Sequence, residues 1–193
     1  MLSLVKAHFQ TKGWRVNTVT EGATLFFQMT DVSPGVLKVE NESAYREMQW
    51  IIADFMGQLG EVSRRLPNIL NDGKPWLILH DRGEFDAVPY VGGEAEFARR
   101  LAESGRSEAQ LFAKYDLIFH LESLAAGKPA AYEQTSNDRR YETTEVAAQM
   151  DAHIGAAWRR HPRYTLIRAT SDFSEKVESV IQKLSVFLSA SGQ

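Results

Sequence analysis

Short apolar runs alternate along this chain with longer segments in which apolar residues recur every three or four positions. The runs lie at 14–20, 76–80, 116–121 and 164–168. Such runs are typical of strands, and the periodic segments between them are typical of helices that connect parallel strands. The alternation predicts an α/β fold with a mainly parallel sheet, in which 76–80 and 116–121 are buried on both faces.

The periodic segments predict the helices and their ends. They lie at 2–12, 45–66, 94–114 with a break near Gly105, 146–158 and 172–188. Asp172 and Glu175 have the spacing of a capping box at the last of them. Residues 71–75 form a turn, 21–41 show no clear period, and the polar segment 123–142 is predicted to be a loop or lid.

Composition restricts the classes of protein to consider. A chain of 193 residues without a linker-like stretch predicts a single domain spanning 1–193. Lys and Arg total 22 and Asp and Glu total 25, so the net charge of −3 argues against a nucleic-acid partner. The absence of cysteine excludes disulfides, thiolate zinc sites and cysteine nucleophiles. No apolar run approaches the roughly 20 residues of a membrane span, and the first residues lack a signal-peptide pattern, so a cytoplasmic protein is expected.

Polar side chains follow the predicted strands, where ligands bind in open parallel sheets. They are Glu21, Asp81, Arg82, Glu122, Thr170 and Ser171. Asp81 could hold Mg²⁺ directly or through water, and Arg82 could bind a phosphate or a carboxylate. An aspartate after a strand is also common at the start of a turn, so both interpretations of Asp81 stay open.

Two arginines and the histidines complete the candidates. Arg139 and Arg140 in the predicted lid could reach a transferring phosphoryl group, or they could pair with acidic neighbours in a solvated loop. The five histidines show no zinc-binding spacing. His80 and His120 lie within strands and are expected to satisfy buried hydrogen bonds rather than to catalyse.

The order of several segments resembles a known family. After Glu21 and the long helix come 76–83 with Asp86, 114–122, 137–142 and 170–176. Together they resemble the small AAA-type P-loop domains grouped with the ribosylnicotinamide-kinase domain and the TRPL-translocation-defect proteins, over nearly the whole chain. The resemblance implies a three-layer αβα parallel sheet that binds ATP or GTP with Mg²⁺.

One part of the family pattern is missing. The family begins with a strand and a GxxxxGK[ST] phosphate loop, and this sequence contains no such motif. The resemblance implies that the first residues match the helix after that loop, and that the sheet lacks its first, central strand between 76–80 and 116–121. We expect a fragment of a longer protein, or else an engineered or naturally inactive module, with weak or no nucleotide binding.

The resemblance also assigns roles. Asp81 would be the Walker B carboxylate near Mg²⁺, Glu21 a candidate catalytic base, and Arg82 a contact to substrate or phosphate. Arg139 or Arg140 would be the lid arginine. Thr170 and Ser171 would lie beside the nucleotide base.

Two functions therefore remain. The first is a nucleotide-binding P-loop domain, either kinase-like in phosphoryl transfer or an NTPase switch, impaired by the missing phosphate loop. The alternative is a non-catalytic module for acidic lipid or a protein partner, since the family includes members that bind acidic phospholipid. The sequence has no cluster of about 4–8 Lys and Arg residues, which disfavours binding to a membrane surface. An open gap in the sheet would invite pairing with a second chain, so a homodimer is also expected.

Overall fold

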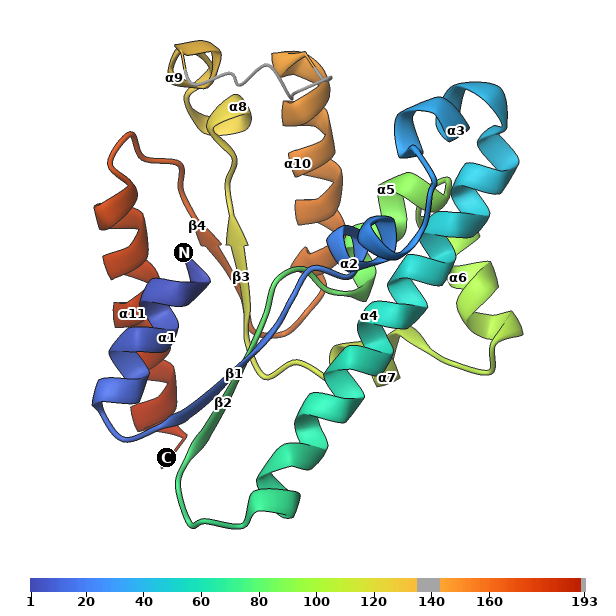
Figure 1. Ribbon diagram of the computed structural model, residues 1–193. Coiled ribbons are helices and arrows are strands. Elements are labelled where there is room, and N and C mark those ends of the chain that lie inside the picture. The colour runs from blue at the N-terminus through green and yellow to red at the C-terminus, as the bar shows by residue number, and fades with distance from the viewer. Residues whose placement is uncertain (135–142, 192–193) are drawn as a thin grey trace. The chain divides into compact units, whose positions relative to one another are not determined.

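The chain forms two compact units, residues 1–104 and 105–193, in a computed structural model that describes residues 1–134 and 143–191 (Figure 1). Both units combine helices with one pair of parallel strands. The first unit contains α1 (Leu2–Thr11), β1 (Arg15–Val19), α2 (Gly22–Met29), α3 (Pro34–Glu40), α4 (Glu42–Leu70), β2 (Trp76–His80), the 3₁₀ turn η1 (Glu84–Ala87), α5 (Val88–Val91) and α6 (Glu94–Glu103).

The sheet of the first unit consists of β1 and β2 in parallel register, from Arg15 opposite Trp76 to Val19 opposite His80. In the described part of the chain, β2 pairs with no other strand. The sequence predicts that β2 is buried on both faces, but all five of its residues are partly exposed. The prediction of complete burial is wrong, because the neighbouring elements cover the side chains of β2 only in part.

The long helix α4 organises the core of the first unit. Its Asn41 cap accepts a hydrogen bond from the Ala44 N–H at 3.0 Å, and the helix ends where Asn71 adopts a left-handed φ of 40°. The buried face of α4 carries Tyr45, Met48, Ile52 and Met56. The predicted helix over 45–66 and the turn after it are confirmed.

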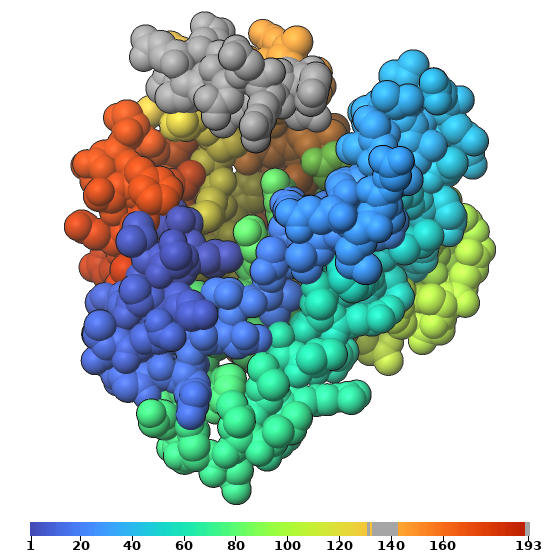
Figure 2. Space-filling model, in the orientation of Figure 1, coloured from blue at the N-terminus to red at the C-terminus, as the bar shows by residue number. Residues whose placement is uncertain are grey.

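Residues 21–41, which show no clear period, form the two short helices α2 and α3. Phe26 and Phe27 of α2 and Leu37 of α3 pack against the buried face of α4. Figure 2 shows both helices, in mid and light blue, lying over α4. Each helix makes only about two turns, which is too short for a helical period to stand out in the sequence.

The second unit contains α7 (Glu108–Phe112), β3 (Ile118–Leu121), α8 (Leu124–Gly127), α9 (Pro129–Gln134), α10 (Thr144–Arg159), β4 (Tyr164–Ile167) and α11 (Phe173–Ala190). Strands β3 and β4 are parallel, with Ile118 opposite Tyr164 and Leu121 opposite Ile167. The predicted helix break is confirmed, because Gly105 has a φ of 71° between α6 and α7. The strands and helices predicted after it are confirmed as well, but the predicted burial of β3 on both faces is wrong, because Ile118 and Phe119 are partly exposed and Leu121 is exposed.

The segment 123–142, predicted to be a loop or lid, begins with the two short helices α8 and α9. The Ser123 hydroxyl caps α8 by accepting a hydrogen bond from the Ala126 N–H at 3.2 Å. Arg139 and Arg140 lie outside the described residues. The role of the segment as a lid stays a prediction.

The mixed α/β character and the parallel pairing of strands are confirmed. The described strands form two separate pairs, β1–β2 and β3–β4, and a single three-layer sheet stays a prediction. Within the described residues, every helix is too short or too polar to cross a membrane.

Candidate functional site

Glu21, Asp81 and Arg82 lie together at the carboxyl ends of β1 and β2. Glu21 is the N-cap position of α2, two residues after β1 ends. Asp81 directly follows β2, and its N–H donates to the Val19 carbonyl at 2.8 Å. Because the strands are parallel, both ends face the same edge of the sheet. The strand-end rule thus brings these residues together as the sequence predicts.

The Arg82 guanidinium lies between two carboxylates. Its Nε is 3.5 Å from Glu21 Oε1, and its Nη1 is 3.5 Å from Asp86 Oδ1. Arg82 has a φ of 74°, in the left-handed region that costs energy for a residue with a side chain. The side chain is 45% exposed, so a ligand in solvent can reach it. We call Glu21, Asp81, Arg82 and Asp86 the strand-end cluster.

Each carboxylate that flanks Arg82 also accepts a hydrogen bond from a neighbouring group. Asp86 Oδ2 accepts from the Gly83 N–H at 2.7 Å, at the start of η1. Glu21 Oε2 accepts from the Thr24 hydroxyl at 2.7 Å. The Asp86 side chain is 15% exposed and that of Glu21 is 34% exposed, so Asp86 is the more firmly enclosed of the two.

Asp81 is the most exposed of the three carboxylates in the cluster. Partial burial and the negative charge of Glu21 raise its pKa above the ordinary value. The positive charge of Arg82 opposes this rise.

The cluster suits a metal ion only in combination with phosphate. Among the described residues, no three His, Cys, Asp or Glu side chains gather in a metal-binding arrangement. Protein-bound Mg²⁺ is typically held by one or two carboxylates together with phosphate oxygens and water. Asp81 fits that role, whereas the described residues offer no cage made only of protein ligands.

In the second unit, Glu122 follows β3 and is held in place by its own surroundings. Its carboxylate accepts from Arg168 Nη1 at 3.0 Å and from the Ala169 N–H at 2.8 Å. Its carbonyl accepts from Lys176 Nζ at 2.6 Å. The Glu122 side chain is 15% exposed, so this carboxylate joins β3 to the loop after β4.

Replacing Glu122 with alanine should lower the free energy of unfolding by about 1–3 kcal/mol, because the Ala169 N–H and Arg168 lose their shared acceptor. Urea denaturation measures the effect. Glu178→Ala, at an exposed position on α11, is the matched control and should change stability by less than about 0.5 kcal/mol. Equal stabilities of the two variants would show that Glu122 has no structural role.

His120 satisfies a buried hydrogen bond, as the sequence predicts. Its Nε2 lies 3.2 Å from Asp151 Oδ2, and Asp151 Oδ1 accepts from the Ser123 N–H at 3.0 Å. Burial alone would raise the pKa of Asp151, but these hydrogen bonds outweigh it and lower the pKa. Sequence reasoning missed Asp151 and Lys176, because both belong to helices far along the chain from β3.

Thr170 and Ser171 lie in the loop after β4, as predicted, and bond within the second unit. The Thr170 hydroxyl donates to Glu175 Oε2 at 2.7 Å, and Lys128 Nζ lies 3.5 Å from Ser171 Oγ. The predicted capping box forms only in part. Asp172 accepts from the Ser174 N–H at 2.7 Å, but Glu175 is taken up by Thr170.

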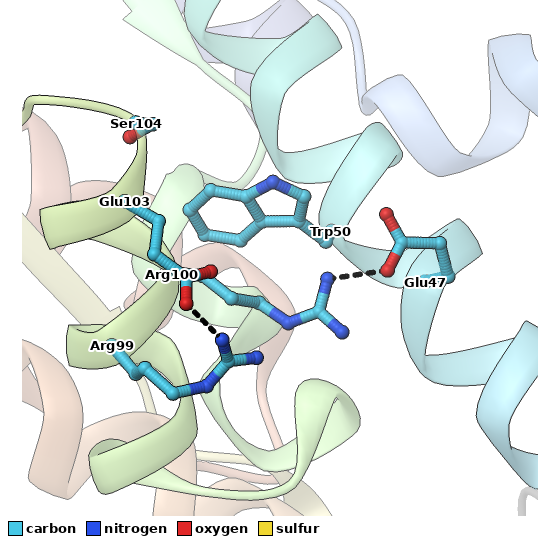
Figure 3. Close-up of a pocket in the computed structure, with 6 residues that line it drawn as sticks. All are labelled: Glu47, Trp50, Arg99, Arg100, Glu103 and Ser104. Carbon is cyan, nitrogen blue, oxygen red and sulfur yellow. Dashed lines mark hydrogen bonds and ion pairs between the residues drawn. The ribbon is translucent and has the colours of Figure 1, made fainter.

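A hollow of about 330 Å³ lies between α4 and α6 in the first unit. It is lined by Glu47, Trp50, Arg99, Arg100, Glu103 and Ser104 (Figure 3). Arg100 pairs with Glu47 at 2.7 Å beside the Trp50 ring, and Arg99 pairs with Glu103. These charges already neutralise one another. The Arg100–Glu47 pair joins α6 to α4, and the hollow, whose arginines are paired with carboxylates, does not suit an anion.

Comparison with family models, curated proteins and solved structures gave no match for this chain. The strand-end cluster therefore stands on its own geometry. Of the residues that the sequence singled out, it contains Glu21, Asp81 and Arg82. Thr170 and Ser171 belong to the second unit, and Arg139 and Arg140 lie outside the described residues.

Proposed function

We propose that the strand-end cluster binds a nucleoside triphosphate with Mg²⁺. The whole chain would then be a P-loop-like, three-layer αβα domain of kinase-like or NTPase-switch type. The observation that carries the proposal is the convergence of Glu21, Asp81 and Arg82 at the carboxyl ends of two parallel strands. The resemblance to small AAA-type P-loop domains supports the choice of a nucleotide over other anions.

Each residue of the cluster has a role that matches its chemistry. Arg82 would donate in a forked geometry to phosphate oxygens. Asp81 would hold Mg²⁺, directly or through water, and the ion would neutralise negative charge on the phosphates. Glu21 would accept the proton of an acceptor hydroxyl.

The affinity should be weak. This sequence contains no GxxxxGK[ST] loop, the motif whose backbone N–H groups surround the phosphates in P-loop proteins. One arginine and one metal-binding carboxylate supply only a few charge-assisted contacts. We expect a Kd on the order of 1 mM for the Mg²⁺ complex of ATP or GTP.

Asp81→Asn should remove the Mg²⁺ dependence of nucleotide binding and weaken binding about tenfold or more, while the chain stays folded. Calorimetric titration of ATP and GTP, with and without Mg²⁺, measures this. Asp116→Asn is the matched control, since Asp116 is 89% exposed and lies before β3. If the folded Asp81→Asn protein kept the wild-type response to Mg²⁺, Asp81 would not belong to the site.

A protein partner is the second candidate function. It is favoured by the exposed apolar side chains of the α2–α3 region, with Met29 at 77%, Val36 at 52% and Val39 at 87% exposure. A non-catalytic module would use this surface and would bind no nucleotide. The titration above therefore also separates the two functions.

A further inference from the structure

Arg82 is shared by two carboxylates that come from different parts of the first unit. Asp86 lies four residues along the same turn, and Glu21 comes from the start of α2. Both distances to the guanidinium are 3.5 Å, which is long for an ion pair. Partly exposed pairs of this kind are weak, so either of them can be exchanged for another anion.

The two carboxylates differ in how firmly they are held. Asp86 is bonded at 2.7 Å to the Gly83 N–H, in the turn that also fixes the left-handed backbone of Arg82. Arg82 and Asp86 therefore belong to one local structure. Glu21 is more exposed, and among the described residues its other oxygen accepts a hydrogen bond from the side-chain hydroxyl of Thr24.

We infer that Glu21 competes with the phosphate for Arg82, and that Asp86 is the positioning residue that keeps the guanidinium in place during the exchange. This inference rests on the proposed function. Carboxylates and phosphates bind a guanidinium in the same forked geometry, so a phosphate can replace Glu21 without moving Arg82 far. The exchange makes Glu21 available to an acceptor hydroxyl only when the ligand is bound.

The inference predicts opposite effects for two substitutions that remove the same charge. Glu21→Gln removes the competitor and should tighten the binding of inorganic pyrophosphate about threefold. Asp86→Asn leaves an oxygen to accept from Gly83 but weakens the hold on Arg82, so it should loosen binding about threefold. A purely electrostatic effect would tighten binding in both variants, because each loses one negative charge.

The experiment is a titration of the full chain with pyrophosphate, for the wild type, Glu21→Gln, Asp86→Asn and the control Asp116→Asn. The control should stay within about twofold of the wild type. In an Arg82→Gln background, Glu21→Gln should no longer tighten binding, because its effect acts through the arginine. This second comparison tests the inference even if Asp86→Asn proves unstable in urea.

Tighter binding in both single variants overturns the positioning role of Asp86 and leaves the proposed site intact. Weaker binding in Glu21→Gln shows that Glu21 contacts the ligand rather than competing with it. Tightening that persists without Arg82 overturns the exchange itself. If the wild type binds neither pyrophosphate nor Mg²⁺-nucleotide, the proposed function fails together with the inference.

Discussion

Replacing Gly57 with alanine is expected to lower the free energy of unfolding by about 2–3 kcal/mol. An added Cβ would lie 2.6 Å from Glu84 Oε1 and 2.9 Å from its Cδ. The Glu84 side chain is only 1% exposed, so its carboxylate cannot retreat into solvent. Either α4 shifts away from η1, or a buried carboxylate loses its place. Urea denaturation measures the difference.

The matched control is Gly35→Ala on α3. No atom lies within 4 Å of the Cβ that this change adds, and the backbone is helical. Alanine there should raise stability by about 0.5–1 kcal/mol, because it restricts the unfolded chain more than glycine does. If Gly57→Ala were as stable as Gly35→Ala, the close packing of Glu84 against α4 would be incorrect.

The protein is expected to lose about 2–3 kcal/mol of stability through His80 as the pH falls from 7 to 4. Burial lowers the pKa of His80 from its ordinary value of 6.5 to about 4, and the charge of Arg64 acts in the same direction. The ring lies against α4 at Gly60, where an added Cβ would be 2.8 Å from its Cε1. Protonation would therefore place a second cation beside Arg64 in a confined space.

Stability falls with falling pH because the pKa of His80 is about 4 in the folded chain and 6.5 in the unfolded chain. Above about pH 6.5, His80 is neutral in both the folded and the unfolded chain, so it causes no loss of stability there. Between pH 6.5 and 4, the unfolded chain takes up a proton that the folded chain does not, so stability falls. Below about pH 4 the folded chain binds the proton too, and His80 adds no further loss.

The His80 contribution can be isolated with His80→Gln. Protonation of carboxylates with lowered pKa values, such as Asp72 and Asp151, also reduces stability in acid. This loss occurs in the wild type and in His80→Gln alike. The difference between the two unfolding curves from pH 7 to 4 therefore reports His80. Parallel pH dependences would show that His80 is protonated as readily in the folded chain as in the unfolded one.

Local patterns predicted the longer elements of the fold. The helices α4, α10 and α11 have periodic apolar faces over many turns, and the strands are short apolar runs with polar ends. The short helices α2, α3, α8 and α9 were not predicted, because a few residues give no measurable period. Burial of β2 and β3 was overestimated, because an apolar run does not show how completely other elements cover a strand.

The candidate site was predicted in part. The strand-end rule identified Glu21, Asp81 and Arg82 from position alone. The pairing of Arg82 with Asp86 depends on a left-handed backbone at a non-glycine residue, which no sequence pattern announces. Burial of Glu84 was not predictable from the sequence either. Its carboxylate fits because Gly57, 27 positions earlier on α4, has no side chain at that point.

The most direct test of nucleotide binding is a titration of the isotope-labelled chain with Mg²⁺ and ATP, followed by backbone amide NMR. We predict saturable shifts in the two segments of the strand-end cluster, residues 21–24 and 81–86, and the loss of these shifts in Asp81→Asn. Shifts confined to the hollow around Trp50 and Arg99, or no saturable shifts at all, would contradict this prediction.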